Sequence, residues 1–163
     1  MLTALVYLAA NSAQAQLPVL PKVLAFGNLT YANPVNTGFK NLTDHGFGYE
    51  IGAGIGLGKN MLVASAGQIT YKIANAGNLK VTPIKLGLRR YLLLGLFLNG
   101  SLGLAMQDYD FRTDKKNSLL YEVGAGYKFG FFEVGAAYTG YELAAPYGTA
   151  NSLLFKAGLA IKL

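Results

Sequence analysis

The chain has 163 residues, a formal net charge of +6 and no cysteine, and only 13% of its residues are charged. This length fits one domain, and the charged fraction is about half that of a typical soluble domain. The basic residues are scattered rather than clustered, so we expect no nucleic-acid partner. Without cysteine the chain has neither disulfides nor thiolate metal sites. No internal apolar run reaches the roughly 18 residues of a membrane-spanning helix.

Residues 1–15 have the pattern of a secretory signal peptide. An apolar run from Leu2 to Ala10 is followed by small residues at Ala13 and Ala15, which predicts cleavage before Gln16. The basic region that usually precedes such a run is missing, which suggests a true start upstream of Met1. The alternative is an extra apolar strand or a short helix. We expect an exported protein whose mature part, 16–163, is a single domain.

Beyond the leader, apolar residues alternate with small or charged ones. In 121–129, for example, Tyr121 and Val123 alternate with Glu122 and Gly124. Side chains of a strand point alternately to opposite faces, so this pattern predicts strands with one apolar face. Alternation and turn residues together predict eight strands, at about 22–32, 46–57, 61–73, 79–91, 96–109, 118–129, 131–142 and 151–163.

The connections between these strands alternate in length. Those near 58–60, 92–95 and 130 are short, whereas 33–45, 74–78, 110–117 and 143–150 are longer. Outer-membrane barrels have short periplasmic turns and longer external loops. An unpaired strand edge in lipid would leave polar backbone groups unsatisfied, so the first and last strands must pair. The sequence therefore predicts an all-β protein, an eight-stranded antiparallel up-and-down transmembrane β-barrel with its large aliphatic side chains facing lipid.

Two further expectations concern the proline within a strand and the aromatic residues at the strand ends. Pro83 falls inside 79–91 and lacks a backbone donor, so we expect a bulge or a place near the rim. Aromatic residues gather toward strand ends, where membrane interfaces favour them. Two girdles are predicted, with Tyr31, Phe47, Tyr49, Tyr71, Tyr109, Tyr121, Tyr138 and Tyr141 at the long-loop ends and Tyr91, Phe129, Phe131 and Phe132 at the short-turn ends.

From Gly46 onward the chain resembles the porin-like outer-membrane β-barrel domain family. The motifs that support this resemblance are Gly-Phe-Gly-Tyr at 46–49 with Gly-Ala-Gly at 52–54, the stretches 82–91 and 121–129, and the pair 132–135 and 138–141. The resemblance implies a small eight-stranded barrel of the bacterial outer membrane. Such barrels commonly end in an aromatic residue read by the barrel-assembly machinery, whereas this chain ends in Leu163.

The face opposite the aliphatic side chains carries charges of both signs. An eight-stranded barrel is just wide enough for side chains to fill it, so these charges are expected to pair inside. One interpretation is a structural plug, and the other is a narrow ion path or gate whose pairs exchange. The predicted interior network comprises Glu50, Lys85, Arg89, Glu122, Lys128, Glu133 and Lys156, with Lys162, Gln68, Asn99 and Gln107 also facing inward.

No catalytic, cofactor or metal site is predicted. The sole histidine, His45, lies beside Asp44 in a loop without a neighbouring nucleophile; the candidate hydroxyls are Thr43, Thr70 and Ser118. Loop carboxylates could in principle hold Ca²⁺, but cations interleave with them and are instead available to lipopolysaccharide phosphates. The carboxylates are Asp108, Asp110, Asp114 and Glu142, and the cations are Arg112, Lys115 and Lys116.

These patterns favour a non-enzymatic integral outer-membrane barrel with exposed loops that serve envelope integrity or surface interaction. The alternative is a small porin-like channel. A soluble lipocalin-type barrel fits less well, because it would need its aliphatic face inside. The expected partners are outer-membrane lipids, lipopolysaccharide and the barrel-assembly machinery, and the expected state is a monomer.

Overall fold

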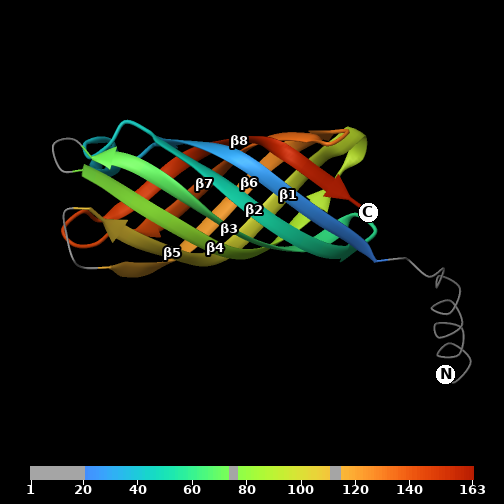
Figure 1. The fold of residues 1–163 in the computed structure, drawn as a ribbon, viewed down its shortest axis with the longest axis horizontal. Coiled ribbons are helices and arrows are strands. Elements are labelled where there is room, and N and C mark those ends of the chain that lie inside the picture. Colours follow the sequence, from blue (N-terminus) through green and yellow to red (C-terminus); the bar gives the residue numbers. More distant parts are fainter. Residues whose placement is uncertain (1–20, 74–76, 111–114) are drawn as a thin grey trace, which may run out of the picture.

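A computed structural model describes residues 21–73, 77–110 and 115–163. Within these ranges eight strands form a closed antiparallel barrel, as the sequence predicted (Figure 1). The predicted signal peptide, 1–15, lies outside the described residues. The elements are β1 (Lys22–Pro34), α2 (Thr37–Lys40), β2 (Gly46–Leu57), β3 (Asn60–Ile73), β4 (Gly77–Tyr91), the short 3₁₀ helix η1 (Leu93–Gly95), β5 (Leu96–Tyr109), β6 (Lys116–Phe129), β7 (Phe132–Glu142) and β8 (Thr149–Lys162).

The barrel is closed by pairing between β1 and β8. This ladder runs from Leu24 opposite Lys162 to Pro34 opposite Ser152, so neither strand is left as an open edge. The predicted bounds of β2 and β5 match the structure, and the other strands differ from prediction by at most two residues at either end. The start of β1 and the end of β8 lie at the end of the molecule that has the short turns, which we call the turn end (Figure 1). The opposite end, which carries the long connections, is the loop end.

The outer wall is apolar, and this confirms the predicted direction of the side chains. Leu102, Val123 and Val134 are 62%, 58% and 54% exposed, whereas Glu122 is 4% exposed. A soluble barrel would bury these aliphatic side chains and expose the glutamate. The described part of the chain has no helix long and apolar enough to cross a membrane.

Pro83 produces neither a bulge nor a rim position, so that prediction is wrong. It lies in the middle of β4 and pairs with Ala105 of β5. On the β3 side the pairing is interrupted between Ala66–Ile84 and Ile69–Val81, yet the register is the same on both sides of the gap. The missing donor therefore removes local pairing with one neighbour without inserting a residue.

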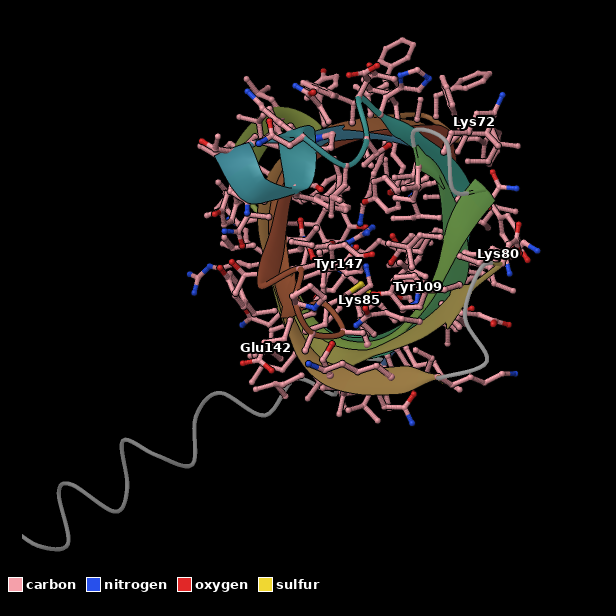
Figure 2. All side chains as sticks on the ribbon, turned by 90° about the vertical axis from the view of Figure 1, so that its left-hand side faces the viewer. Lys72, Lys80, Lys85, Tyr109, Glu142 and Tyr147 are labelled. Atoms are coloured by element: carbon pink, nitrogen blue, oxygen red, sulfur yellow. The ribbon has the colours of Figure 1, made fainter. Side chains whose placement is uncertain are left out.

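Apolar side chains fill much of the lumen on both sides of its charged middle, so the charges expected to pair inside make up only part of the filling. At the loop end an apolar cluster fills it, and loop residues contribute as well as strands. Phe39 of α2 is fully buried and packs edge-on against Tyr71, and Leu143 and Ala144 fold over the same mouth. Figure 2 looks into this end and shows Tyr109 and Tyr147 inside the ring of strands. Toward the turn end a smaller cluster contains Leu24, Phe26, Met61, Tyr91, Phe97 and Ala160.

Four tyrosines assigned to the interfacial girdles face the lumen instead. They occupy strand positions of the same parity as buried neighbours, for example Tyr71 beside Ile69, and burial of the ring outweighs placement at the interface. Tyr71 lies within 3.5 Å of the Ser152 hydroxyl, which gives its own hydroxyl a polar partner. The inward tyrosines are Tyr71, Tyr91, Tyr109 and Tyr141. The predicted girdle residues that do face outward are Tyr31, Phe47, Tyr49, Tyr121, Tyr138, Phe129, Phe131 and Phe132.

Candidate functional site: the barrel lumen

Four charged side chains form a closed ring across the middle of the lumen. The Lys85 ammonium lies 2.8 Å from Glu50 and 2.7 Å from Glu122. The Lys156 ammonium lies 2.6 Å from each of the same two carboxylates. Every member thus touches two partners of opposite charge, and the ring as a whole is neutral. We call these four residues the charged ring.

The charged ring follows directly from strand parity. Glu50, Lys85, Glu122 and Lys156 come from β2, β4, β6 and β8, so every second strand contributes one member. Each lies at an inward position of its strand, between outward aliphatic or aromatic neighbours. An uncompensated charge buried this deeply would be strongly destabilising, and the alternating geometry compensates each one twice.

A second charged group lies closer to the turn end. Arg89 of β4 donates to Glu133 of β7 at 2.9 Å, and Asn28 of β1 donates to the other oxygen of the same carboxylate at 2.9 Å. The guanidinium lies between the rings of Phe26 and Phe97, 4.7 Å and 4.4 Å from their centroids. Cation–π contact and ion pairing together hold this arginine in a mostly apolar layer.

Two glycines make room for these aromatic rings. A Cβ added to Gly52 would lie 2.3 Å from Phe26, and one added to Gly126 would lie 2.3 Å from Phe97. The Gly-rich inner faces of β2 and β6 therefore allow the Phe–Arg–Phe stack to form. The stack thus accounts for glycine at these two positions of the alternating pattern.

A cavity of about 50 Å³ lies between the two charged groups. Glu50, Glu122 and Lys156 line it from the charged ring, and Arg89, Glu133 and Asn28 line it from the turn-end side. Its volume is enough for a few water molecules. Arg89 Nε and Asn28 Oδ1 are buried and have no hydrogen-bond partner among the described residues. The cavity is far smaller than the pockets that hold drug-sized ligands.

The structure brings together six of the seven residues predicted for the interior network. The seventh, Lys128, faces inward, but it lies at the turn end and donates to the carbonyl of Gly130 in its own turn. Of the other inward predictions, Lys162 lies 3.9 Å from the centre of the Tyr91 ring. Asn99 lines the cavity, and Gln107 is buried.

Gln68 was assigned to the wrong face. It pairs with outward Tyr49, and the inward positions of β3 include Met61, Ile69 and Tyr71. Small residues dilute the alternation in this strand, so the sequence pattern did not show which parity was inside.

Next to the apolar cluster at the loop end lies a polar cluster that the sequence analysis predicted only in part. Gln107 donates to the Ser118 hydroxyl at 2.9 Å and to the Glu142 carbonyl at 2.6 Å. Tyr109 donates to Gln107 at 2.7 Å, so its hydroxyl belongs to the lumen. Asn28 was likewise not among the predicted inward residues. It alternates with Phe26 and Thr30 along 22–32, so it faces the same side of the strand as they do. The Gln107 contacts join β5 to β6 and to the last residue of β7.

Among the hydroxyls weighed with His45, Ser118 lies apart from it, whereas Thr43 donates to the His45 carbonyl at 3.2 Å. His45 packs on the outer aromatics Tyr31 and Phe47, with ring centroids 6.0 Å and 5.3 Å away. Ser118 faces the lumen and donates to the Glu142 carbonyl at 2.8 Å. The imidazole and this hydroxyl thus lie on opposite sides of the barrel wall, so they cannot act together as a base and a nucleophile.

The described loop carboxylates Asp108, Asp110 and Glu142 are each paired with a nearby cation. Asp110 accepts from Asn78 at 3.0 Å and from Lys80 at 3.3 Å, and these donors hold the pKa of its carboxyl below the usual value. Asp108 pairs with Lys115 and Glu142 with Lys116. Among the described residues no group of three or more potential metal ligands gathers. Asp114 and Arg112 lie outside the described residues.

Comparison with solved structures finds small transmembrane barrels of bacterial outer membranes. Ail of Yersinia pestis matches with a TM-score of 0.59 and 16% identity, over 86% of this chain and 98% of that one. Neisserial surface protein A matches at 0.51 and 15%, over 88% and 96%. The amino-terminal barrel of Pseudomonas aeruginosa OprF matches at 0.50 and 18%, over 86% and 96%. At such low identities the superpositions show a shared fold alone.

Neither protein-family models nor curated protein sequences give a match. The likeness therefore lies in the fold, the closed antiparallel barrel of eight strands.

Proposed function

We propose that this chain is an integral outer-membrane barrel that has no enzymatic activity and presents its long connections at the cell surface. The supporting observation is the combination of an apolar outer wall with an interior whose charges are paired within the barrel. Export by the leader 1–15, cleaved before Gln16, is part of this proposal. So is monomeric insertion by the barrel-assembly machinery, with outer-membrane lipids around the wall.

In this proposal the lumen is a structural plug that keeps the barrel rigid and closed to solutes. The charged ring blocks its middle with four mutual contacts, and the loop-end cluster packs its outer mouth with buried apolar side chains. Ion passage would require both layers to separate. The rigid barrel then serves to hold the loops in place and to reinforce the envelope.

The loop end supplies the surface for interaction. Lys40 and Lys72 are exposed beside His45, and Lys80 near the start of β4 and Lys115 just before β6 are exposed as well. Figure 2 shows Lys72 and Lys80 at the outer rim, pointing away from the lumen. Lysine ammonium groups at this height can contact phosphates of lipopolysaccharide.

The test is folding into lipid vesicles followed by electrophoresis of boiled and unboiled samples. A membrane barrel resists the detergent until boiled, so the two samples should migrate differently. Equal migration, with cooperative unfolding in buffer without lipid or detergent, would contradict the proposal.

Conductance across planar bilayers, measured on the same folded sample, tests the closed lumen. We expect no persistent single-channel openings. Stable openings would favour the small-channel alternative and show that the charged ring opens. A sample of Lys85→Ala, which removes one member of the ring, is the control that shows whether a gap in this layer is detectable.

A further inference from the structure

The net charge of the protein is concentrated at one end of the barrel. In the lumen, the three cations Lys85, Arg89 and Lys156 are balanced by three buried carboxylates, which are Glu50, Glu122 and Glu133. At the loop end, described cations and carboxylates nearly cancel. At the turn end five cations stand together, and the described residues there include no exposed carboxylate side chain. We call these five the turn-end cations: Lys22, Lys59, Arg90, Lys128 and Lys162.

The turn-end cations divide into two groups by direction. Lys22, Lys128 and Lys162 share the inward parity of their strands and surround the mouth of the lumen, close enough for Lys22 and Lys128 to repel the Lys162 ammonium. Arg90 is exposed on the outer wall, and Lys59 is exposed in the β2–β3 turn beside it. They are neighbours, because the Lys59 carbonyl accepts from the Tyr91 amide at 2.8 Å and Arg90 pairs with Asn60. We call Lys59 and Arg90 the wall pair.

The surroundings of the wall pair are strongly apolar. Arg90 is opposite Leu98 of β5, and Leu88, two residues before it on the same face, is exposed. The η1 turn that follows β4 exposes Leu93 and Leu94, the latter by 86%. Cations set beside exposed leucines at the rim of a barrel match the boundary between acyl chains and headgroups, where both chemistries are available.

We propose that the wall pair binds the phosphate of anionic phospholipid headgroups in the leaflet at the turn end. Arg90 offers paired guanidinium donors to phosphate oxygens, and Lys59 adds a second positive charge from the adjacent turn. The three mouth lysines strengthen the local field without touching the lipid beside the wall. This surface rests on the proposed membrane location and adds to it a preferred headgroup charge and a preferred leaflet.

A soluble polyanion is the competing ligand for so many cations. It would use the mouth lysines, which face the aqueous axis, and would leave the exposed leucines beside the wall pair unexplained. The apolar surroundings of Lys59 and Arg90 favour lipid, because only lipid supplies hydrocarbon and phosphate at the same height.

The experiment uses the absence of tryptophan from the chain. Leu93→Trp introduces one fluorophore beside the wall pair, and Leu119→Trp introduces one near the loop end of the same outer wall. Each protein is folded into vesicles that mix phosphatidylglycerol and phosphatidylcholine, with bromine on the acyl chains of one lipid at a time. Quenching then gives the relative affinity of each site for the two headgroups.

We expect at least about threefold preference for phosphatidylglycerol at position 93 and about equal quenching at position 119, because each nearby cation favours anionic lipid. Lys59→Gln with Arg90→Gln should abolish the preference at 93. The matched charge control, Lys40→Gln with Lys72→Gln at the loop end, should leave the preference at 93 unchanged. Lys128→Gln with Lys162→Gln at the mouth should retain more than half of it. Higher salt should reduce the preference.

Three results would overturn the inference: no preference at position 93, a preference that survives loss of the wall pair, or a preference abolished by the mouth variant. If inorganic polyphosphate removed the preference for phosphatidylglycerol at position 93 and sodium chloride of equal ionic strength did not, the cations would bind a soluble anion instead. The boiled and unboiled gel samples are run for every variant. Loss of the shift in the unmodified chain would refute the membrane proposal, whereas an intact shift without lipid preference refutes only this inference.

Discussion

Glu122 is the residue on which the charged ring depends most. Its two carboxylate oxygens accept from two different lysines, Lys85 and Lys156, and its side chain is almost completely buried. Removing its charge would leave two ammonium groups to share Glu50 alone. Breaking a buried pair is costly because the remaining partner keeps its desolvation penalty.

Glu122→Gln should therefore lower the free energy of unfolding by about 3–5 kcal/mol, since a buried cation loses its partner. The measurement is the urea dependence of the heat-modifiable band in lipid vesicles. Glu142→Gln is the matched control, because that side chain is 71% exposed and pairs only at the surface with Lys116. The control should change stability by less than about 1 kcal/mol.

Removing opposite charges together separates pairing from packing. Lys85→Met with Glu122→Leu leaves Lys156 paired with Glu50, so the double variant should be more stable than Glu122→Gln alone. A double variant that is less stable than the single one would show that the ring does not act through charge compensation.

At the scale of the strands, the Phe–Arg–Phe stack depends on glycines in its neighbours. Gly126 of β6 lies against Phe97 and also approaches the Val134 carbonyl, to which a Cβ would come within 2.6 Å. Gly100 of β5, by contrast, has nothing within 4 Å of the place where a Cβ would stand. The two positions therefore differ in packing while both lie within strands of the same barrel.

Gly126→Ala should destabilise the barrel by about 1–3 kcal/mol, because the added methyl must push Phe97 away from Arg89 or shift the backbone. Gly100→Ala should be neutral or slightly stabilising, since it adds no clash. Both are measured as shifts in the urea midpoint of the folded band. Equal effects of the two substitutions would contradict the proposed role of Gly126.

For the whole molecule, the decisive property is the continuous apolar wall around a filled lumen. Val123 lies in the middle of β6, which corresponds to the centre of the hydrocarbon layer. Leu119 lies near the loop end of the same strand face. A charge placed at these two heights meets different surroundings, although both side chains are exposed.

Val123→Arg should cost about 2–4 kcal/mol of stability in vesicles, whereas Leu119→Arg should cost about 0–1 kcal/mol, because the penalty for a charge depends on its depth in the bilayer. The two variants should have equal stability in detergent micelles, because a micelle adapts its shape around a charge. A soluble protein would tolerate both substitutions about equally, which would contradict membrane insertion.

The sequence predicted the face on which most site residues lie, but not their height in the barrel. Alternation gave the correct face for Glu50, Lys85, Glu122 and Lys156, because parity is a property of one strand. It could not tell that Lys128 lies below the network, since the height of a residue in the barrel depends on register and tilt relative to all its neighbours. In β3 even the parity was ambiguous, and Gln68 was placed on the wrong face.

The sequence by itself determined the barrel, its strand bounds and its lipid-facing wall, because a period of two residues and alternating loop lengths are local patterns that closure in lipid then makes unique. Only the tertiary structure decided that Tyr71, Tyr109 and Tyr141 turn inward to form a cap, that Pro83 keeps its register, and that positive charge gathers at the turn end outside the lumen. Those outcomes depend on which residues from distant strands share a level, and that is fixed only when the sheet closes.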